Sequence, residues 1–419
     1  MGAPLPSPTY ADDEQTDFVL IKKFGYVADR EDATTATDLL QGPDLKGSIK
    51  VTFCAACPLR ISYFCVHATE YGRADFDLDP AILATEGPLV LLSAFLPSSS
   101  DMFHPVAKEY FVYHAGTSDT KGEGKKKARR LSLMHLPNPG RHHEFEEASA
   151  TLLQTCSEHH SSSGSTLLPH GGNQEDHNCE ACEFVIAAKH SARVRSVRRE
   201  RGIGGIVCWD APYNHHWTDK AIAIGRDDGV VAWVNLGRDI LFCDVLAETP
   251  TLCPIELPPL IPPSKGVGTS GDPRCSRDVA IADGFIHYTQ LQIRIVPGSF
   301  MDDGAVTFDG WKAAKCSMAI DARSLPLAEA SWQHTGLLEL DSSQISMLLP
   351  SLVVDDGSTI AFERLHIDYR ERTTYVLAVD LRNKTMKSVA EFGAKHTIGL
   401  GQAFIASSIS KYLKVAPGD

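Results

Sequence analysis

Hydrophobic positions along this chain fall into short runs separated by turn-forming residues, a pattern typical of β-strands. The clearest example is residues 229–246, GVVAWVNLGRDILFCDVL. Two apolar arms, Val230–Asn235 and Ile240–Leu246, flank a turn at Gly237 and Arg238, and β-branched and aromatic residues fill both arms. This segment is therefore predicted to form an antiparallel hairpin.

The same strand–turn–strand pattern recurs along most of the chain, from Phe18–Val27 to Ser388–Phe392. Strand pairs at this density predict an all-β protein with a single β-propeller-like domain of six or seven blades. Each four-stranded blade would use about 50–60 residues. Because no strict repeat is visible, a two-domain array of β-sandwiches stays open as an alternative. Helical signals are weak, and Asp341–Leu349, with Asp341 or Ser342 as the cap, is the candidate for a short helix.

Composition divides the chain of 419 residues into a tail, a domain and an insertion. Residues 1–16 are polar and rich in proline, which predicts a disordered tail. The β-propeller-like domain is predicted to span residues 17–415. Within it, residues 138–178 are rich in Pro, Gly, Ser, His and Glu, which predicts a long and partly disordered insertion.

The net charge and the cysteine content limit the classes of partner and the cellular compartments that we expect for this protein. The formal net charge of −13 argues against nucleic-acid binding through the whole surface, which needs a dense basic face. No segment has the length and apolarity of a signal peptide or a membrane span. The 11 cysteines are odd in number and scattered through strand-like segments, as expected of free thiols in a reducing compartment. We expect a monomeric, cytoplasmic or nuclear protein.

One cluster suggests a metal site. Cys179 and Cys182 are separated by two residues, and His177 precedes them closely. Two such thiolates can bind one Zn²⁺ while imidazoles complete a tetrahedron. The competing interpretation, buried or loop thiols, is favoured because Cys182 begins an apolar strand. A second set with the same two interpretations comprises Cys54, Cys57, Cys65 and His67. We therefore predict no cofactor and keep Cys179, Cys182 and His177 as the metal candidates.

Catalytic motifs are incomplete. Gly266–Gly271 matches G-x-G-x-x-G, but a Pro-rich loop precedes it and no helix follows, so a dinucleotide site is not expected. His215, His216 and Trp217 with Asp219 could form a polar cluster, but such a neighbourhood alone predicts a solvated turn. No catalytic residue is assigned, which favours a protein that is not an enzyme.

A compact basic run interrupts the acidic chain. It consists of Lys125, Lys126, Lys127, Arg129 and Arg130, separated only by Ala128. Such a run is compatible with a nuclear import signal, with contact to an anionic partner, or with a solvated loop.

Several segments together resemble a known family. They include Ala28-Asp29-Arg30, Phe64–His67, Trp233–Leu236, Ile240–Val245 and Trp311–Ala314, and they span about residues 17–415. On these segments the chain resembles the grass-expanded plant family with domain of unknown function 1618. The resemblance implies a plant origin and a β-propeller-like domain, and it implies no catalytic residues.

The predicted function is a non-enzymatic scaffold or regulator that binds a protein partner, because loops on a rigid β framework suit recognition. One alternative is a small-ligand or enzymatic site at the central channel, which would need polar residues converging from different blades. The other is a zinc-stabilised regulator that uses Cys179 and Cys182.

Overall fold

The computed structural model of this chain describes residues 19–42, 45–56, 61–97, 106–116, 131–136, 145–156, 182–190, 193–200, 203–210, 216–224, 229–259, 261, 273–282, 284–296, 298–299, 308–320, 331–341, 348–351, 359–365, 373–380, 385–393 and 404–413. Within these ranges it contains β-strands and short 3-10 helices but no α-helix. The prediction of an all-β protein is confirmed. None of the helices described is long and apolar enough to cross a membrane.

The described strands form six sheets, numbered here in chain order. Sheet 1 contains β1 (Val19–Lys22), β2 (Tyr26–Val27), β3 (Ala36–Leu39), β4 (Ser48–Cys54), β5 (Ile61–Ala68) and β26 (Phe404–Ser407). Sheet 2 contains β6 (Ala81–Glu86), β7 (Leu89–Pro97), β8 (Val106–His114) and β9 (Ser132–Leu136). Sheet 3 contains β10 (Thr151–Cys156), β11 (Cys182–His190), β12 (Arg193–Glu200) and β13 (Ile203–Asp210).

Sheets 4, 5 and 6 each contain four strands that follow one another along the chain. Sheet 4 contains β14 (Lys220–Ile224), β15 (Val230–Asn235), β16 (Asp239–Asp244) and β17 (Cys253–Glu256). Sheet 5 contains β18 (Arg277–Ala282), β19 (Phe285–Ile295), β20 (Phe308–Ala319) and β21 (Gln333–Asp341). Sheet 6 contains β22 (Leu348–Ser351), β23 (Thr359–Leu365), β24 (Thr373–Asp380) and β25 (Thr385–Gly393). Short 3-10 helices are η1 (Arg73–Asp75), η3 (Glu147–Ser149), η5 (Pro273–Cys275) and η7 (Ser408–Lys411).

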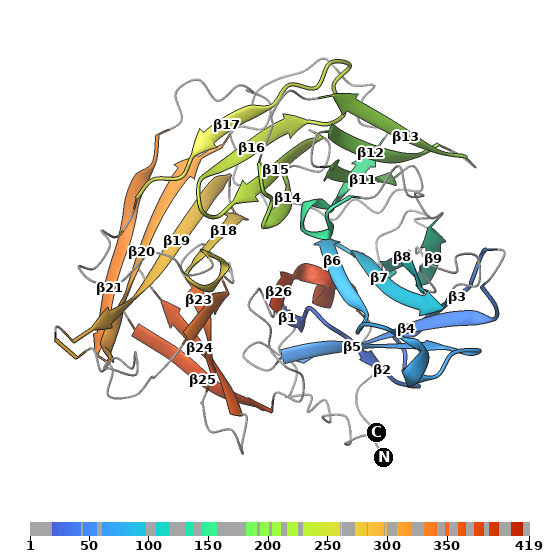
Figure 1. Ribbon diagram of the computed structural model, residues 1–419, viewed down its shortest axis with the longest axis horizontal. Coiled ribbons are helices and arrows are strands. Elements are labelled where there is room, and N and C mark those ends of the chain that lie inside the picture. Colours follow the sequence, from blue (N-terminus) through green and yellow to red (C-terminus); the bar gives the residue numbers. More distant parts are fainter. Residues whose placement is uncertain are drawn as a thin grey trace, which may run out of the picture.

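Sheets 2 to 6 are four-stranded antiparallel meanders, in which each strand pairs with the next one along the chain. Figure 1 shows these sheets following one another around a central region, with first strands such as β6, β14 and β18 toward the middle. The first strands also contact one another in sequence: β6 contacts β10, β10 contacts β14, β14 contacts β18 and β18 contacts β22. The first strand of each of these sheets therefore lies close to the first strand of the next sheet.

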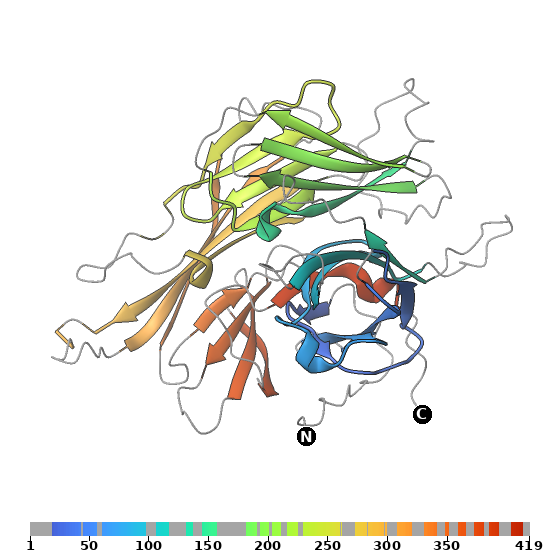
Figure 2. The ribbon, with the colours of Figure 1, turned by 45° about the vertical axis from the view of Figure 1, so that its right-hand side comes forward.

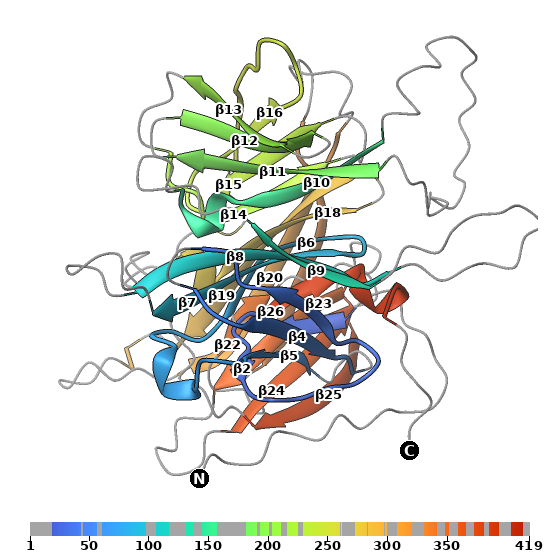
Figure 3. The same ribbon diagram turned by 90° about the vertical axis from the view of Figure 1, so that its right-hand side faces the viewer.

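Hydrophobic cores lie between sheets that are consecutive in the chain. Figure 3 shows sheets 1, 2 and 3 as successive layers. Separate cores join sheets 1 and 2, sheets 2 and 3, sheets 3 and 4, and sheets 4 and 5. Their buried side chains include Phe53 with Phe111, Leu91 with Ile186, Val185 with Trp233, and Phe242 with Tyr288, in that order.

This stacking explains the continuous apolar runs in the sequence. In β15, Val230, Ala232 and Val234 enter the core shared with sheet 5, and Val231 and Trp233 enter the core shared with sheet 3. Side chains alternate between the two faces of a strand, and both faces of sheet 4 are covered. The predicted hairpin is confirmed, although its second strand begins at Asp239 and ends at Asp244.

Both ends of the described chain contribute to sheet 1. β1 pairs antiparallel with β26, so that Val19 lies opposite Ser407, and it pairs in parallel with β5, so that Leu20 lies opposite Ile61. In Figure 2 the blue strands of sheet 1 and the red C-terminal segment lie together. One sheet therefore joins segments from opposite ends of the chain.

Some expectations about local structure need correction or stay open. A helix over Asp341–Leu349 is wrong at both ends, because Asp341 ends β21 and Leu348 begins β22. Within the predicted insertion at 138–178, residues 145–156 carry η3 and β10. The rest of that stretch, and the predicted tail at 1–16, lie outside the described residues.

Gly229 should be intolerant of a side chain. Its φ is +67°, and an added Cβ would lie 2.6 Å from the Leu246 side chain. Gly284 has a similar φ of +74°, with nothing within 4 Å of that position. We expect Gly284→Ala to lower the free energy of unfolding by about 1 kcal/mol, from backbone strain, and Gly229→Ala by about 2 kcal/mol, because steric overlap is added.

Urea unfolding of both glycine variants beside the parent protein measures this difference. Equal destabilisation by the two substitutions would show that Leu246 moves aside without cost.

Candidate functional site

The residues singled out as metal or nuclear-import candidates are not placed by the structure. His177, Cys179 and the run Lys125–Arg130 lie outside the described residues, and for Cys182 only the backbone, at the start of β11, is described. Among the residues that the structure describes, no group of three or more His, Cys, Asp or Glu side chains could hold a metal ion. These assignments remain predictions.

A different group of polar residues gathers where the first strands of the sheets begin, a region we call the inner-strand end. Its members are Lys23, which follows β1; Glu147 of η3, before β10; Asp219, before β14; and Arg274 of η5, before β18. Since consecutive first strands contact one another, residues far apart in sequence share this end of the fold.

Lys23 reaches this region because the chain after β1 runs against the start of β6. The Lys23 carbonyl accepts a hydrogen bond from the Ile82 backbone at 2.9 Å, and the Gly25 backbone donates to the Pro80 carbonyl at 2.8 Å. Between them, Phe24 forms an isolated β-bridge with Ala81. Sheet 1 and sheet 2 are thus joined at the inner-strand end.

A buried polar cluster fixes the segment that leads into β14. His216 Nε2 lies 3.3 Å from Asp239 Oδ1, with His216 and Asp239 side chains 0% and 3% exposed. The Lys189 ammonium donates to the His216 carbonyl at 2.6 Å, and His216 Nδ1 lies 3.3 Å from Thr218 Oγ1. The expected solvated turn is therefore wrong for His216, whose carboxylate neighbour is Asp239 and not Asp219.

Electrostatics keep His216 neutral. Burial is the main cause that lowers the pKa of His216 to about 4, and the cations of Lys189 and Arg238 act in the same direction. Burial also lowers the pKa of Lys189, against the opposing influence of Glu146 and Asp239. At neutral pH His216 is an uncharged packing group.

The order Thr218, His216, Asp239 has the residue types of a nucleophile, a base and an orienting acid. Substrate would need to reach the Thr218 hydroxyl, but Thr218, His216 and Asp239 are 2%, 4% and 2% exposed. A base must also accept a proton near the working pH, which a histidine with a pKa of about 4 does poorly. The arrangement therefore fits a structural role.

Ion pairs connect sheets 4 and 5 at the same end. The Lys220 ammonium lies 3.0 Å from Asp278 Oδ1 and also donates to the Val279 carbonyl at 3.0 Å. Arg274 Nε lies 3.9 Å from Asp219 Oδ1, while Asp219 Oδ2 accepts from the Leu236 backbone at 2.9 Å. These contacts hold the starts of β14 and β18 together.

Glu147 connects η3 to sheet 2. Its carboxylate accepts from the Ser93 hydroxyl at 2.8 Å and lies 2.9 Å from the Lys108 ammonium. Lys108 also lies over the Phe95 ring, 4.9 Å from its centroid. The Glu147 side chain keeps 33% of its surface exposed, so it can still meet a ligand or partner.

Lys23 has the most unusual electrostatic setting of this group. Burial is the main cause that lowers its pKa; the Glu147 carboxylate opposes this effect, and the Arg274 cation makes a smaller contribution that lowers the pKa. A half-buried ammonium beside another cation gains from an added negative charge. A further acidic group near Lys23 would therefore stabilise its charged form.

Two exposed aromatic side chains lie at the inner-strand end. Trp217 is 70% exposed, although the residues on either side of it, His216 and Thr218, are buried. Phe24 is 44% exposed beside the start of β6. Tryptophan is enriched among the residues that dominate protein interfaces, which makes Trp217 a candidate contact residue.

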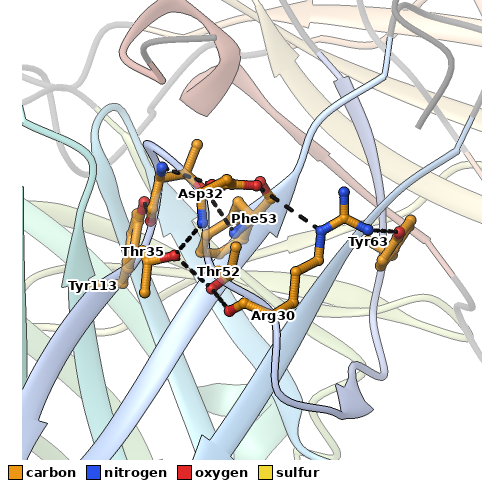
Figure 4. Close-up of polar contacts among 8 residues, drawn as sticks. Arg30, Asp32, Thr35, Thr52, Phe53, Tyr63 and Tyr113 are labelled. Atoms are coloured by element: carbon orange, nitrogen blue, oxygen red, sulfur yellow. Dashed lines mark hydrogen bonds and ion pairs between the residues drawn. The ribbon is translucent and has the colours of Figure 1, made fainter. Parts of the chain in front are cut away.

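A second polar network holds the loop between β2 and β3, as Figure 4 shows. Asp32 Oδ1 accepts from the Thr34 backbone at 2.7 Å, and Thr34 Oγ1 accepts from the Phe53 backbone at 2.9 Å. The buried Tyr113 hydroxyl of β8 donates to the Thr34 carbonyl at 2.6 Å. The loop is thereby fixed to both sheet 1 and sheet 2.

Arg30 extends this network toward the other face of sheet 1. Its carbonyl accepts from the Thr52 hydroxyl at 2.7 Å, and its guanidinium donates to the Tyr63 hydroxyl at 3.0 Å (Figure 4).

Sequence reasoning did not assign the inner-strand end as a site. The available signal was positional: Asp219 and Lys220 stand immediately before one predicted strand, and Arg277 and Asp278 before another. Charged residues at the starts of several first strands indicate a shared polar end once the strands are known to lie around one centre.

Comparison with known proteins gives one family match. Residues 233–360, from β15 of sheet 4 to β23 of sheet 6, match the family described as "Protein of unknown function (DUF1618)". No curated protein matches the chain. The matched segment includes Arg274 of the inner-strand end, together with Asp239 and Asp278, which contact residues near it.

Proposed function

We propose that this chain, which belongs to the DUF1618 family, is a β-propeller-like recognition module that binds a protein partner at its inner-strand end. The propeller arrangement is supported by face-to-face cores between consecutive sheets and by first strands that contact one another in order. Such a framework holds the segments between its strands in fixed positions.

The observation that carries the proposal is the exposed Trp217. An exposed tryptophan on a flexible loop would lose backbone conformational entropy on binding, whereas the backbone at Trp217 is restrained by the buried neighbours His216 and Thr218. Tryptophan and arginine dominate the energetics of many protein interfaces. An arginine is also present near Trp217, because Arg274 pairs with Asp219, which is two residues after Trp217 in the sequence. We infer that Trp217 is the anchor and that the surrounding charges select the partner.

The partner should offer an apolar pocket bordered by acidic groups. A pocket would take the Trp217 indole, and a carboxylate would relieve the repulsion between Lys23 and Arg274. The described free thiols Cys54, Cys65, Cys243, Cys253 and Cys316 support our further proposal that this binding takes place inside the cell.

Replacing Trp217 with alanine should weaken partner binding at least about tenfold, because a central tryptophan contributes about 2 kcal/mol or more at an interface. Tagged full-length proteins would first be used to capture partners from an extract of grass tissue, the source that the family resemblance implies. Binding would then be measured with the purified partner by calorimetry.

Leu337→Ala is the matched control, because Leu337 is 51% exposed on β21, the last strand of sheet 5. It should bind as the parent does. A partner that binds Trp217→Ala and the parent equally would overturn the assignment of the anchor. If no stoichiometric protein is captured, the recognition role itself is rejected.

A second candidate function is the binding of a small acidic ligand at the same end. The half-buried Lys23, with its lowered pKa, favours it. Native mass spectrometry of the purified protein separates the two functions, because a co-purifying acidic metabolite that is lost in Lys23→Gln and retained in Trp217→Ala would support the ligand site.

A further inference from the structure

The cysteines Cys54 and Cys65 form a pair on one face of sheet 1. In the register of β4 and β5, Cys54 lies opposite Tyr63, and Cys65 lies opposite Thr52. The two cysteines are therefore diagonal neighbours whose side chains point to the same side of the sheet. They belong to one buried cluster, and the Cys65 side chain is the largest influence on the pKa of Cys54.

This face is separate from the core shared with sheet 2. Cys54, Tyr63 and Cys65 form their own buried cluster, with Tyr26 packed against it. Tyr26 and Tyr63 meet edge to face, with ring centroids 5.4 Å apart. Both cysteines are 1% exposed, so a protein-sized reagent cannot reach them in this conformation.

Arg30 places a positive charge beside the pair. Its guanidinium donates to the Tyr63 hydroxyl at 3.0 Å and interacts electrostatically with both cysteines. The Arg30 side chain is 27% exposed, so this cation contacts solvent while it also interacts with the buried pair.

The two thiols differ from each other in acidity: the pKa of Cys65 is raised by its contact with Cys54 and by burial, whereas the pKa of Cys54 is lowered. The contact with Cys65 lowers the pKa of Cys54, and the Arg30 cation contributes in the same direction against the effect of burial. Burial raises the pKa of Cys243 and of Cys316 to about 12, and it raises the pKa of Cys253 as well. Thiolate character, which governs cysteine reactivity, is therefore concentrated at Cys54.

We propose that Cys54 and Cys65 form a reversible disulfide when the protein meets a small hydroperoxide, with Arg30 as the residue that positions and stabilises the attacking thiolate. This modification site lies on sheet 1 and includes none of the residues that define the inner-strand end. It does not depend on the proposed recognition function.

The reaction uses one hydroperoxide for each disulfide. The Cys54 thiolate attacks one peroxide oxygen, the O–O bond breaks, and the alcohol or water leaves with a proton. The resulting sulfenic acid is attacked by the Cys65 sulfur, so the S–S bond forms and water leaves. Two thiols and ROOH thus give a disulfide, ROH and water.

Peptide mapping of the full-length protein tests the proposal. The protein is treated with hydrogen peroxide, alkylated and digested with trypsin, which cleaves after Lys50, Arg60 and Arg73. Cys54 and Cys65 then lie in different peptides, so their disulfide appears as a linked pair whose mass is two hydrogen atoms below the sum. We expect this species to form before Cys243, Cys253 or Cys316 is modified, and dithiothreitol to reverse it.

Variants separate the role of Arg30 from a general effect on folding. Arg30→Gln should slow formation of the linked pair several-fold, Arg30→Lys should restore much of the rate because the charge is retained, and Cys243→Ser should leave the rate unchanged. The proposal is overturned if Cys54 and Cys65 stay reduced while other thiols react. It is also overturned if fragment spectra show Cys54 joined to Cys57, which shares its tryptic peptide.

Discussion

Replacing Trp233 with alanine is expected to lower the free energy of unfolding by about 3–5 kcal/mol, the range for truncating a buried large aromatic side chain. Trp233 is 0% exposed and packs in the core between sheets 3 and 4, beside Leu153 and Val185. Its indole also donates to the Ser149 carbonyl at 2.8 Å, across 84 residues of sequence. The substitution therefore removes both a packing element and a link between two sheets.

A second variant separates these contributions. Trp233→Phe keeps much of the apolar volume but removes the indole donor, so it should cost about 1–3 kcal/mol through the lost buried hydrogen bond. Trp217→Ala, at a tryptophan that is 70% exposed, should change stability by no more than about 0.5 kcal/mol. Guanidinium unfolding followed by circular dichroism gives all three values. Similar losses at Trp233 and Trp217 would mean that Trp233 is not packed as described.

The protein is expected to lose up to about 3 kcal/mol of stability through His216 alone as the pH falls from about 6.5 to about 4. The pKa of His216 is about 4 in the folded protein and about 6.5 in the unfolded chain. Between these values the unfolded chain binds a proton that the folded protein excludes, so acid favours unfolding. Above pH 6.5 the stabilisation is fully present, and below pH 4 no further loss arises from this group.

Unfolding curves at pH 7, 5.5 and 4 measure this loss, with His216→Asn as the comparison. The variant is less stable at pH 7, but its difference from the parent should shrink across this window because asparagine does not titrate. Arg238→Gln removes an exposed cation that helps to lower the pKa of His216, and should move the lower end of the window to higher pH. A parent–variant difference that stays constant with pH would contradict the assignment.

The strands were predictable where local pattern and burial agree. In β15 and β16, β-branched and aromatic residues fill arms that neighbouring sheets cover on both faces, so local propensity and tertiary packing favour the same hairpin. The prediction of a helix over Asp341–Leu349 was wrong because it depended on capping residues alone. Asp341 pairs with Gly310 and Leu348 pairs with Arg364, so both ends of the segment lie in strands.

The candidate site was much less predictable. The burial of His216 depends on Asp239, which is 23 positions later, and on Lys189 from another sheet, and no local pattern reports such contacts. Likewise, Cys54 and Cys65 were weighed as metal ligands because spacing alone does not show that the β4–β5 register brings them together beside Arg30. Chemistry that arises between strands needs the strand register before it can be recognised.

The pairing of β1 with β26 has a consequence for the protein as it leaves the ribosome. Sheets 2 to 5 are built from strands adjacent in sequence and can assemble in order during synthesis. Strand β1 emerges long before its partner β26, so one edge of β1 stays open while the sheets between them are synthesised. Closing a loop that includes sheets 2 to 6 makes this pairing slow and late relative to the assembly of those sheets. A nascent chain that stalls before residue 404 would therefore present that open edge to chaperones and to other copies of itself.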